Sequence, residues 1–107
     1  MKTVPRKPSR YLLFKVNADE LIHEEAIRLS ITESIQNLFG ETGLAEINPR
    51  FFKFDERRLT GIVKCARNST EKLRAAIALI STCAGKPVCM HIPLVSGTSK
   101  GLKMRLH

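Results

Sequence analysis

Hydrophobic and polar residues alternate along several short stretches of the chain, and this period of two predicts β-strands. Four such stretches stand out in the sequence: 11–17, 51–55, 59–67 and 86–95. The polar residues 56–58 between the middle two predict a turn, so these two strands should form a hairpin. Pro87 and Pro93 lack a backbone N–H, which favours an edge position for the last strand.

The same alternation predicts which strand residues face the core. In 51–55, Phe52 and Phe54 share one face and are expected inside, whereas Phe51 is expected outside. In the last strand, the residues expected on one face are Val88, Met90, Ile92 and Leu94. In the first strand, one face carries Leu12, Phe14 and Val16, and the other carries Tyr11, Leu13 and Lys15.

A longer period predicts two helices. The first begins after a cap at Asn17 or Asp19, ends at Gly40, and buries an apolar stripe of Ile27, Ile31, Ile35 and Leu38. The segment 40–49 is then expected to be a glycine-punctuated connection with room for one short helical turn. Residues 68–71 have the spacing of a capping box and open a second helix, which Gly85 ends and which faces inward through Leu73, Ala76, Ile77 and Ile80.

The order strand, helix, strand, strand, helix, strand is typical of the split βαβ pattern. We therefore predict an α+β fold, a two-layer sandwich with a four-stranded, largely antiparallel sheet and both helices on one face, similar to RNA-recognition and ferredoxin-like domains. The predicted βαββαβ domain covers 10–95. A basic extended arm, 1–9, precedes it, and a basic C-terminal segment, 96–107, follows it.

Nearly all of the net charge of +8 lies at the two ends of the chain. Residues 1–10 contribute +4 and residues 96–107 contribute +3, each without an acidic residue, whereas 11–95 carries 11 bases against 10 acids. Two solvated tails would account for this distribution, but a globular body does not need it to fold. We therefore favour an anionic partner.

The C-terminal segment has the residues expected of a phosphate-binding site. Ser96 or Thr98 can cap a helix, Gly97 lets backbone N–H groups converge, and a helix start adds partial positive charge. Leu102 and Leu106, four residues apart, could dock such a helix on the domain. The candidate RNA-binding residues are Arg6, Lys7, Arg10, Ser96, Gly97, Thr98, Lys100, Lys103 and Arg105.

No catalytic or metal-binding arrangement is evident in the sequence. The three histidines are isolated, Asp55 and Glu56 occupy a turn, and the three cysteines are not clustered, so we expect reduced thiols and no bound cofactor. The strand 59–67 has no aromatic residue, so if the anionic partner is RNA, we expect contacts to its backbone rather than base stacking. The N-terminus lacks the apolar stretch of a secretory signal, which favours a cytoplasmic location.

Four stretches, RYLLFKV (10–16), NLFGETGLAEINP (37–49), TGIVKCAR (60–67) and LVSGTSKGLK (94–103), resemble the archaeal ribonuclease P protein component 2 family. The resemblance implies a non-catalytic subunit of the ribonucleoprotein endoribonuclease ribonuclease P. It also implies partnership with the catalytic RNA and with protein component 3, commonly two copies of each protein in a heterotetramer. The RNA, with its magnesium, would remove the 5′ leader of precursor tRNA, which the protein meets only indirectly.

Two alternatives remain open from the sequence. A small-molecule-sensing regulatory domain can share this strand order and would bind its ligand near 40–43 at a subunit interface. A protein-only nuclease is the other. Candidate surfaces for protein partners are the 40–49 segment and the acidic outer face of the first helix, which carries Glu20, Glu24, Glu25 and Glu33.

Overall fold

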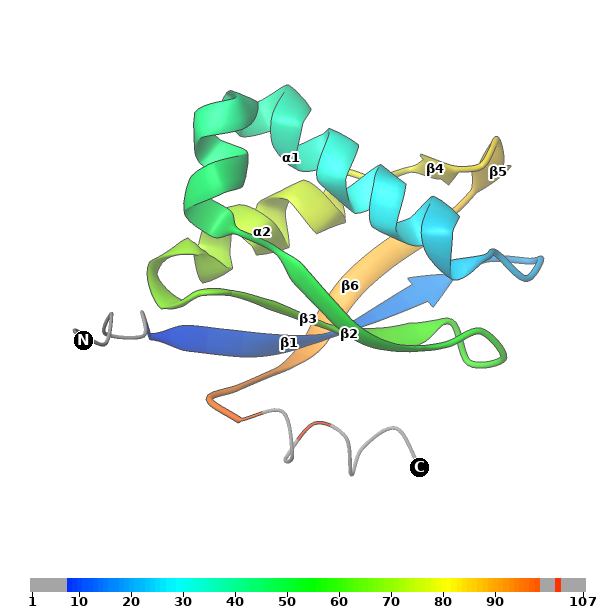
Figure 1. The fold of residues 1–107 in the computed structure, drawn as a ribbon. Helices are drawn as coiled ribbons and strands as arrows, with labels where there is room; N and C mark the ends of the chain where they lie inside the picture. The colour runs from blue at the N-terminus through cyan, green and yellow to red at the C-terminus, as the bar shows by residue number, and fades with distance from the viewer. Residues whose placement is uncertain (1–7, 99–101, 103–107) are drawn as a thin grey trace.

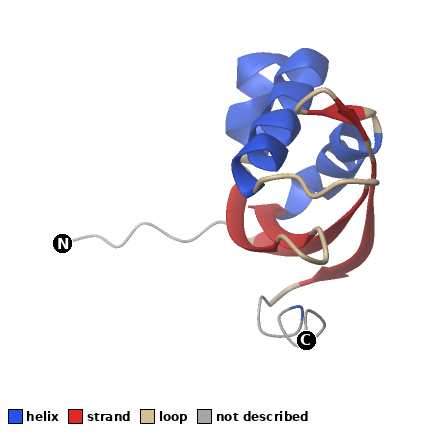
Figure 2. Cartoon of the chain, turned by 90° about the vertical axis from the view of Figure 1, so that its right-hand side faces the viewer, coloured by secondary structure: helices blue, strands red, loops and turns tan. Residues whose placement is uncertain are grey.

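The computed structural model describes residues 8–98 and 102, which form two layers, one of β-sheet and one of helices (Figures 1 and 2). The elements in chain order are β1 (Ser9–Asn17), α1 (Glu24–Ile47), β2 (Arg50–Asp55), β3 (Thr60–Ala66), the 3-10 helix η1 (Arg67–Ser69), α2 (Thr70–Ala78), β4 (Thr82–Cys83), β5 (Lys86–Pro87) and β6 (Cys89–Ser96). None of the described helices is long and apolar enough to cross a membrane.

The main sheet has the strand order β2-β3-β1-β6, and every neighbouring pair is antiparallel. Both α1 and α2 cover the same face of this sheet (Figure 1). The predicted fold class is therefore confirmed, and β6 lies at an edge as Pro93 indicates, while Pro87 belongs to the separate strand β5. The predicted limits of the arm and the C-terminal segment stay a prediction.

The core lies between the helices and one face of the sheet. β1 contributes Leu12, Phe14 and Val16, as the alternation predicts, and the helices contribute Ile27, Ile31, Ile35, Leu73, Ala76 and Ile77. Burying each of the larger side chains stabilises the fold by about 1.5–3 kcal/mol relative to exposure. This face of the sheet therefore stabilises the fold, and the opposite face can make other contacts.

Three phenylalanines pack together where the edge strand β2 meets that core. The Phe14 ring stacks on Phe54 with centroids 6.0 Å apart and meets Phe51 edge-on at 6.5 Å. Gly61 makes room for this arrangement, because a Cβ there would lie 2.6 Å from Phe14 Cζ and 2.8 Å from the Lys53 carbonyl oxygen. Any larger residue would have to displace both a ring and the backbone of β2.

Two β-bulges change the faces that simple alternation predicts. In β2, the register with β3 shifts between Phe51 and Lys53, so Phe52 is the extra residue. Phe51 and Phe54 pack on the core, and Phe52 is 49% exposed. The expectation that Phe52 is inside and Phe51 outside was wrong, because a one-residue bulge reverses the alternation beyond it.

The second bulge lies in β6 opposite Phe14, where the register skips over Ile92 and Pro93. The carbonyl oxygen of Ile92 there accepts a hydrogen bond from Arg74 Nη1 at 3.2 Å, which links α2 to the edge strand. Beyond the bulge, Leu94 packs against Leu13 on the face turned away from the helices. The prediction that Leu94 shares a face with Ile92 was therefore wrong.

The first helix begins later and continues further than predicted, and the expectation that Leu38 belongs to its buried stripe was wrong, because Leu38 is 42% exposed. α1 starts at Glu24 after an N-cap at His23, not directly after Asn17 or Asp19. Gly40 does adopt a positive φ of 70°, but the chain re-enters the helix and continues to Ile47, where Asn48 ends it in the left-handed conformation. The segment 40–49 is thus mostly helical rather than an open connection.

The second helix begins where predicted but ends earlier. No side-chain cap hydrogen bond forms at Ser69, and Thr70 Oγ1 instead donates to the Arg67 carbonyl, so the capping box is not realised. α2 ends at Ala78, and Gly85 does not cap it. Ala84 and Gly85, both with positive φ, instead form the two-residue turn of a small β4–β5 hairpin that the sequence reading missed.

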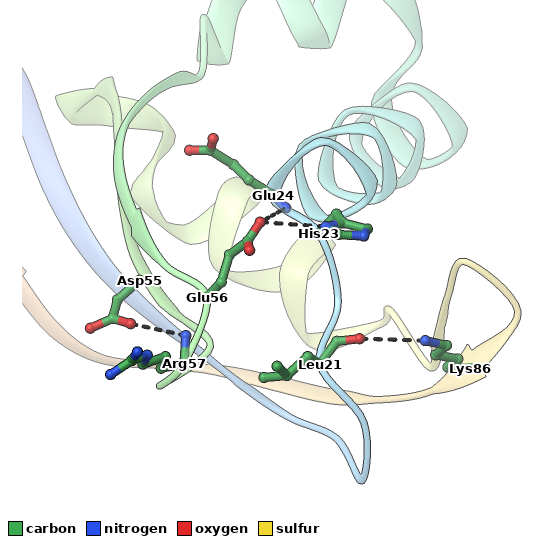
Figure 3. A network of polar contacts seen from close by, with 7 residues as sticks. All are labelled: Leu21, His23, Glu24, Asp55, Glu56, Arg57 and Lys86. Carbon is green, nitrogen blue, oxygen red and sulfur yellow. Dashed lines mark hydrogen bonds and ion pairs between the residues drawn. The ribbon is translucent and has the colours of Figure 1, made fainter.

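Polar contacts join the start of α1 to the β2–β3 turn (Figure 3). Glu56 Oε1 accepts a hydrogen bond from the Glu24 backbone N–H at 3.3 Å and lies 3.6 Å from His23 Nδ1, a contact that is an ion pair only when the imidazole is protonated. Asp55 Oδ1 accepts the backbone N–H of Arg57 at 3.0 Å within the turn. The two turn acids therefore have structural partners, as expected for acidic residues in a hairpin turn.

Gly61→Ala should lower the free energy of unfolding by about 1–3 kcal/mol, because the added methyl group overpacks the phenylalanine cluster. Urea denaturation checks this, with Gly97→Ala as the control, since a Cβ at Gly97 would have no heavy atom nearer than 3.9 Å. Equal stability of the two variants would contradict the packing described here.

Candidate nucleic-acid interface

Three rows of side chains cross the face of the sheet turned away from the helices, which we call the open face. Strand register across β2, β3, β1 and β6 defines the first row as Arg50, Lys64, Tyr11 and Ser96. The second row consists of Lys53, Ile62, Leu13 and Leu94, and the third of Asp55, Thr60, Lys15 and His91. The three apolar residues of the second row, which we call the apolar row, thus lie between the first and third rows, and each of the three rows carries a cation.

The apolar row is covered by Leu102. Leu102 is only 3% exposed and packs with Leu13 and Ile62, while Tyr11 and Leu94 lie against this small cluster. The predicted docking of Leu102 on the domain is confirmed, and Leu106 lies outside the described residues. This contact places Leu102 on the open face of the sheet.

Four of the predicted RNA-binding residues are described, and they lie together at one end of the sheet. Ser96 pairs with Tyr11, and Thr98 donates its backbone N–H to Ser96 Oγ at 3.2 Å. Arg10 Nη1 lies 3.9 Å from the position that a Cβ on Gly97 would occupy. The start of β1 and the end of β6 are thus adjacent. The remaining candidates, Arg6, Lys7, Lys100, Lys103 and Arg105, lie outside the described residues.

Two aromatic rings lie beside the cations of the first row, and the sequence reading missed this pair. The ring centroids of Tyr11 and Phe52 are 5.3 Å apart with an interplanar angle of 55°. Lys64 Nζ lies 5.7 Å from the Tyr11 centroid and 6.0 Å from that of Phe52. Because adjacent strand residues face opposite ways, the Phe51–Phe52 pair did signal that one ring points outward; the bulge decided which one.

The first row borders a groove of about 850 Å³. Its lining is basic, aromatic and polar, with no carboxylate: Ser9, Tyr11, Asn48, Arg50, Phe51, Phe52, Lys64, Cys65 and Gly97. A lining of this kind attracts anions electrostatically and offers an aromatic surface to a flat ligand.

The third row forms a second basic hollow of about 560 Å³. Lys15, Arg58 and His91 line it together with Pro93 and Leu94. Asn17 Nδ2 lies 3.5 Å from His91 Nδ1 and helps to orient that ring. With cations on both sides of the Leu102 contact, the open face can meet an extended polyanion at two separate points.

We assign the cysteines no role in binding on the open face. Cys65 and Cys83 are buried, Cys89 is exposed, and all three are free thiols. Burial raises the pKa of the Cys65 thiol, and a hydrogen bond with Thr70 offsets that rise in part. Within 8–98 and 102, no three histidine, cysteine or acidic side chains come close enough together to hold a metal ion.

A βαββαβ sandwich with cations and aromatic rings on its open sheet face defines a class of small nucleic-acid-binding domains. Comparison with known proteins identifies one family within this class. The family model described as the Rpp14/Pop5 family matches residues 10–107. The chain belongs to the Rpp14/Pop5 family, which confirms the resemblance seen in its four sequence stretches.

Individual relatives agree with this assignment. Ribonuclease P protein component 2 of Pyrococcus horikoshii is 37% identical over 108 residues, covering 98% of this chain and 90% of the relative. The protein of the same name from Archaeoglobus fulgidus is 34% identical, covering 96% and 92%. A chain in the cryo-EM structure of yeast ribonuclease MRP shares the fold, with a TM-score of 0.71 at 13% identity, covering 91% of this chain and 79% of that one.

Leu102→Ala should loosen the C-terminal segment and lower the free energy of unfolding by about 1–3 kcal/mol, because it empties the contact over Leu13 and Ile62. Trypsin cleavage within 96–107 should accelerate at the same time. Leu79→Ala serves as the control, since Leu79 is exposed. If both variants behave like the unaltered protein, Leu102 does not anchor the segment.

Proposed function

We propose that this chain is an RNA-binding protein subunit of ribonuclease P, the ribonucleoprotein that removes 5′ leaders from precursor tRNA. The observation that carries the proposal is the similarity, over nearly the full length, to relatives named ribonuclease P protein component 2. In this role the polypeptide is not the catalyst: the catalytic RNA performs the hydrolysis with magnesium held on the RNA. The protein's contribution is to bind and shape that RNA.

The charge of the open face supports this role in physical terms. Arg10, Arg50, Lys64 and Lys15 lie on or beside it, in a chain of net charge +8. Each cation that neutralises an RNA phosphate releases counterions, which favours binding and lets a crowded polyanion fold at a lower magnesium concentration. The predicted contacts from the arm and from 96–107 would add to this effect at the end of the sheet where Arg10 and Gly97 meet.

A protein partner would use a different surface, the outer face of α1. This face is acidic through Glu25 and Glu33, and between them Leu29 is 58% exposed. The acidic charge of this face contrasts with the basic open face and would complement a basic surface on a protein partner. We assign this face to ribonuclease P protein component 3, in an assembly that would contain two copies of each protein.

The small-molecule alternative has no support in the fold. Its expected ligand loop at 40–43 is part of α1, where the chain re-enters the helix after Gly40.

Reconstitution separates the subunit role from that of a sensing domain or a protein-only nuclease. With component 3 at limiting magnesium, the chain should raise precursor tRNA cleavage by the catalytic RNA. On its own, the chain should leave precursor tRNA intact.

Replacing Lys100, Lys103 and Arg105 together by glutamine should reduce the slope of log K against log salt by roughly 2–3 units, since about three phosphate contacts are lost. The measurement is catalytic-RNA binding across a salt series. The matched control replaces Arg67, Lys72 and Lys86, which removes the same charge elsewhere on the chain. An equal change in both variants would show that only net charge matters and would remove the C-terminal segment as a binding element.

A further inference from the structure

We propose that Tyr11 and Phe52 form a stacking site for an unpaired RNA base on the open face, with Lys64 and Arg50 placed for the adjoining phosphates. This deepens the proposed function, on which it rests, by naming the chemical group that the first row would recognise. It also departs from the expectation that binding uses the RNA backbone alone.

Phe52 is half-exposed on the open face. A half-exposed phenylalanine on an edge strand is a liability for aggregation, and the register of β2 could have placed it inside. The bulge instead places its ring 5.3 Å from Tyr11, which lies on the central strand. The two rings make an aromatic surface outside the main core, with Tyr11 beside the small cluster around Leu102.

The geometry of the pair sets how a base can bind. With 55° between their planes, the rings cannot both stack on one flat ligand. A base that stacks on one ring therefore meets the other at its edge, which is a favourable aromatic contact. The adjoining groove, about 850 Å³, is large enough for a nucleotide.

Charge favours RNA over a peptide as the occupant. No carboxylate lines the groove, and within the described part of the chain neither Arg50 nor Lys64 forms an ion pair. The chain contains a direct contrast where α2 meets α1: Lys72 of α2 lies 5.7 Å from the centroid of the Phe39 ring of α1 but also 3.6 Å from Glu46 Oε2. Glu46 therefore neutralises the charge of Lys72 beside the Phe39 ring. In the first row, the charge of Lys64 beside Tyr11 and Phe52 remains available to bind an anion.

The test uses the intact chain and a single-stranded RNA of about eight nucleotides carrying one 2-aminopurine, at low salt. Stacking should quench the 2-aminopurine fluorescence. Phe52→Leu should abolish the quenching and weaken binding about 5- to 50-fold, as expected for loss of one base–aromatic stack. Tyr11→Phe, which keeps the ring, should bind within about twofold of the unaltered protein. Phe39→Leu is the matched control and should change nothing.

An oligonucleotide that is abasic at the labelled position separates base recognition from backbone binding. It should bind the unaltered protein as weakly as the intact oligonucleotide binds Phe52→Leu. Equal affinity for abasic and intact RNA, with salt dependence retained, would overturn the stacking site but leave RNA binding standing. No binding at any salt concentration would overturn both. Self-association that Phe52→Leu abolishes, measured by sedimentation, would assign the face to a second copy of the chain and overturn the proposal.

Discussion

The structure depends on β1, a central strand with one face in the core and the other on the open face. Leu12, Phe14 and Val16 pack beneath the helices, and the hydrogen-bonded ladders to β3 and β6 hold the strand from both sides. Because side chains alternate, the same strand must present Tyr11, Leu13 and Lys15 to the opposite face. The residues that stabilise the fold therefore fix the positions of those that meet a partner, and each row of the open face is tied to this strand by register.

The alternation rule predicted the fold class and most of the core correctly, because helix stripes and strand periods are local properties. It failed at Phe52 and Leu94, which lie at or beyond a bulge. A bulge results from long-range packing: Phe14 must fit Phe51, Phe54 and Gly61, and no local pattern records that requirement. The boundaries of α1 were missed for a related reason, since the chain resumes its helix after Gly40 despite a strong local stop signal.

The candidate site was predictable in its charge but not in its shape. End-loaded cations pointed to an anionic partner, and Arg10, Ser96 and Gly97 do meet at one end of the sheet. The aromatic part was missed because it combines residues from β1 and β2 with Lys64 of β3. Leu102 adds a further constraint, because it packs over Leu13 and Ile62 and so occupies the middle of the open face.

The central claim is that the open face, not the helical layer, meets RNA. Lysine acetylation footprinting of the reconstituted particle tests it most directly, since Lys15 and Lys64 lie on the open face, while Lys72 belongs to α2 and Lys86 to the small β4–β5 hairpin. Adding the catalytic RNA should slow acetylation of Lys15 and Lys64 several-fold and leave Lys72 and Lys86 unchanged. Protection of Lys72 and Lys86, with Lys15 and Lys64 still reactive, would contradict the account.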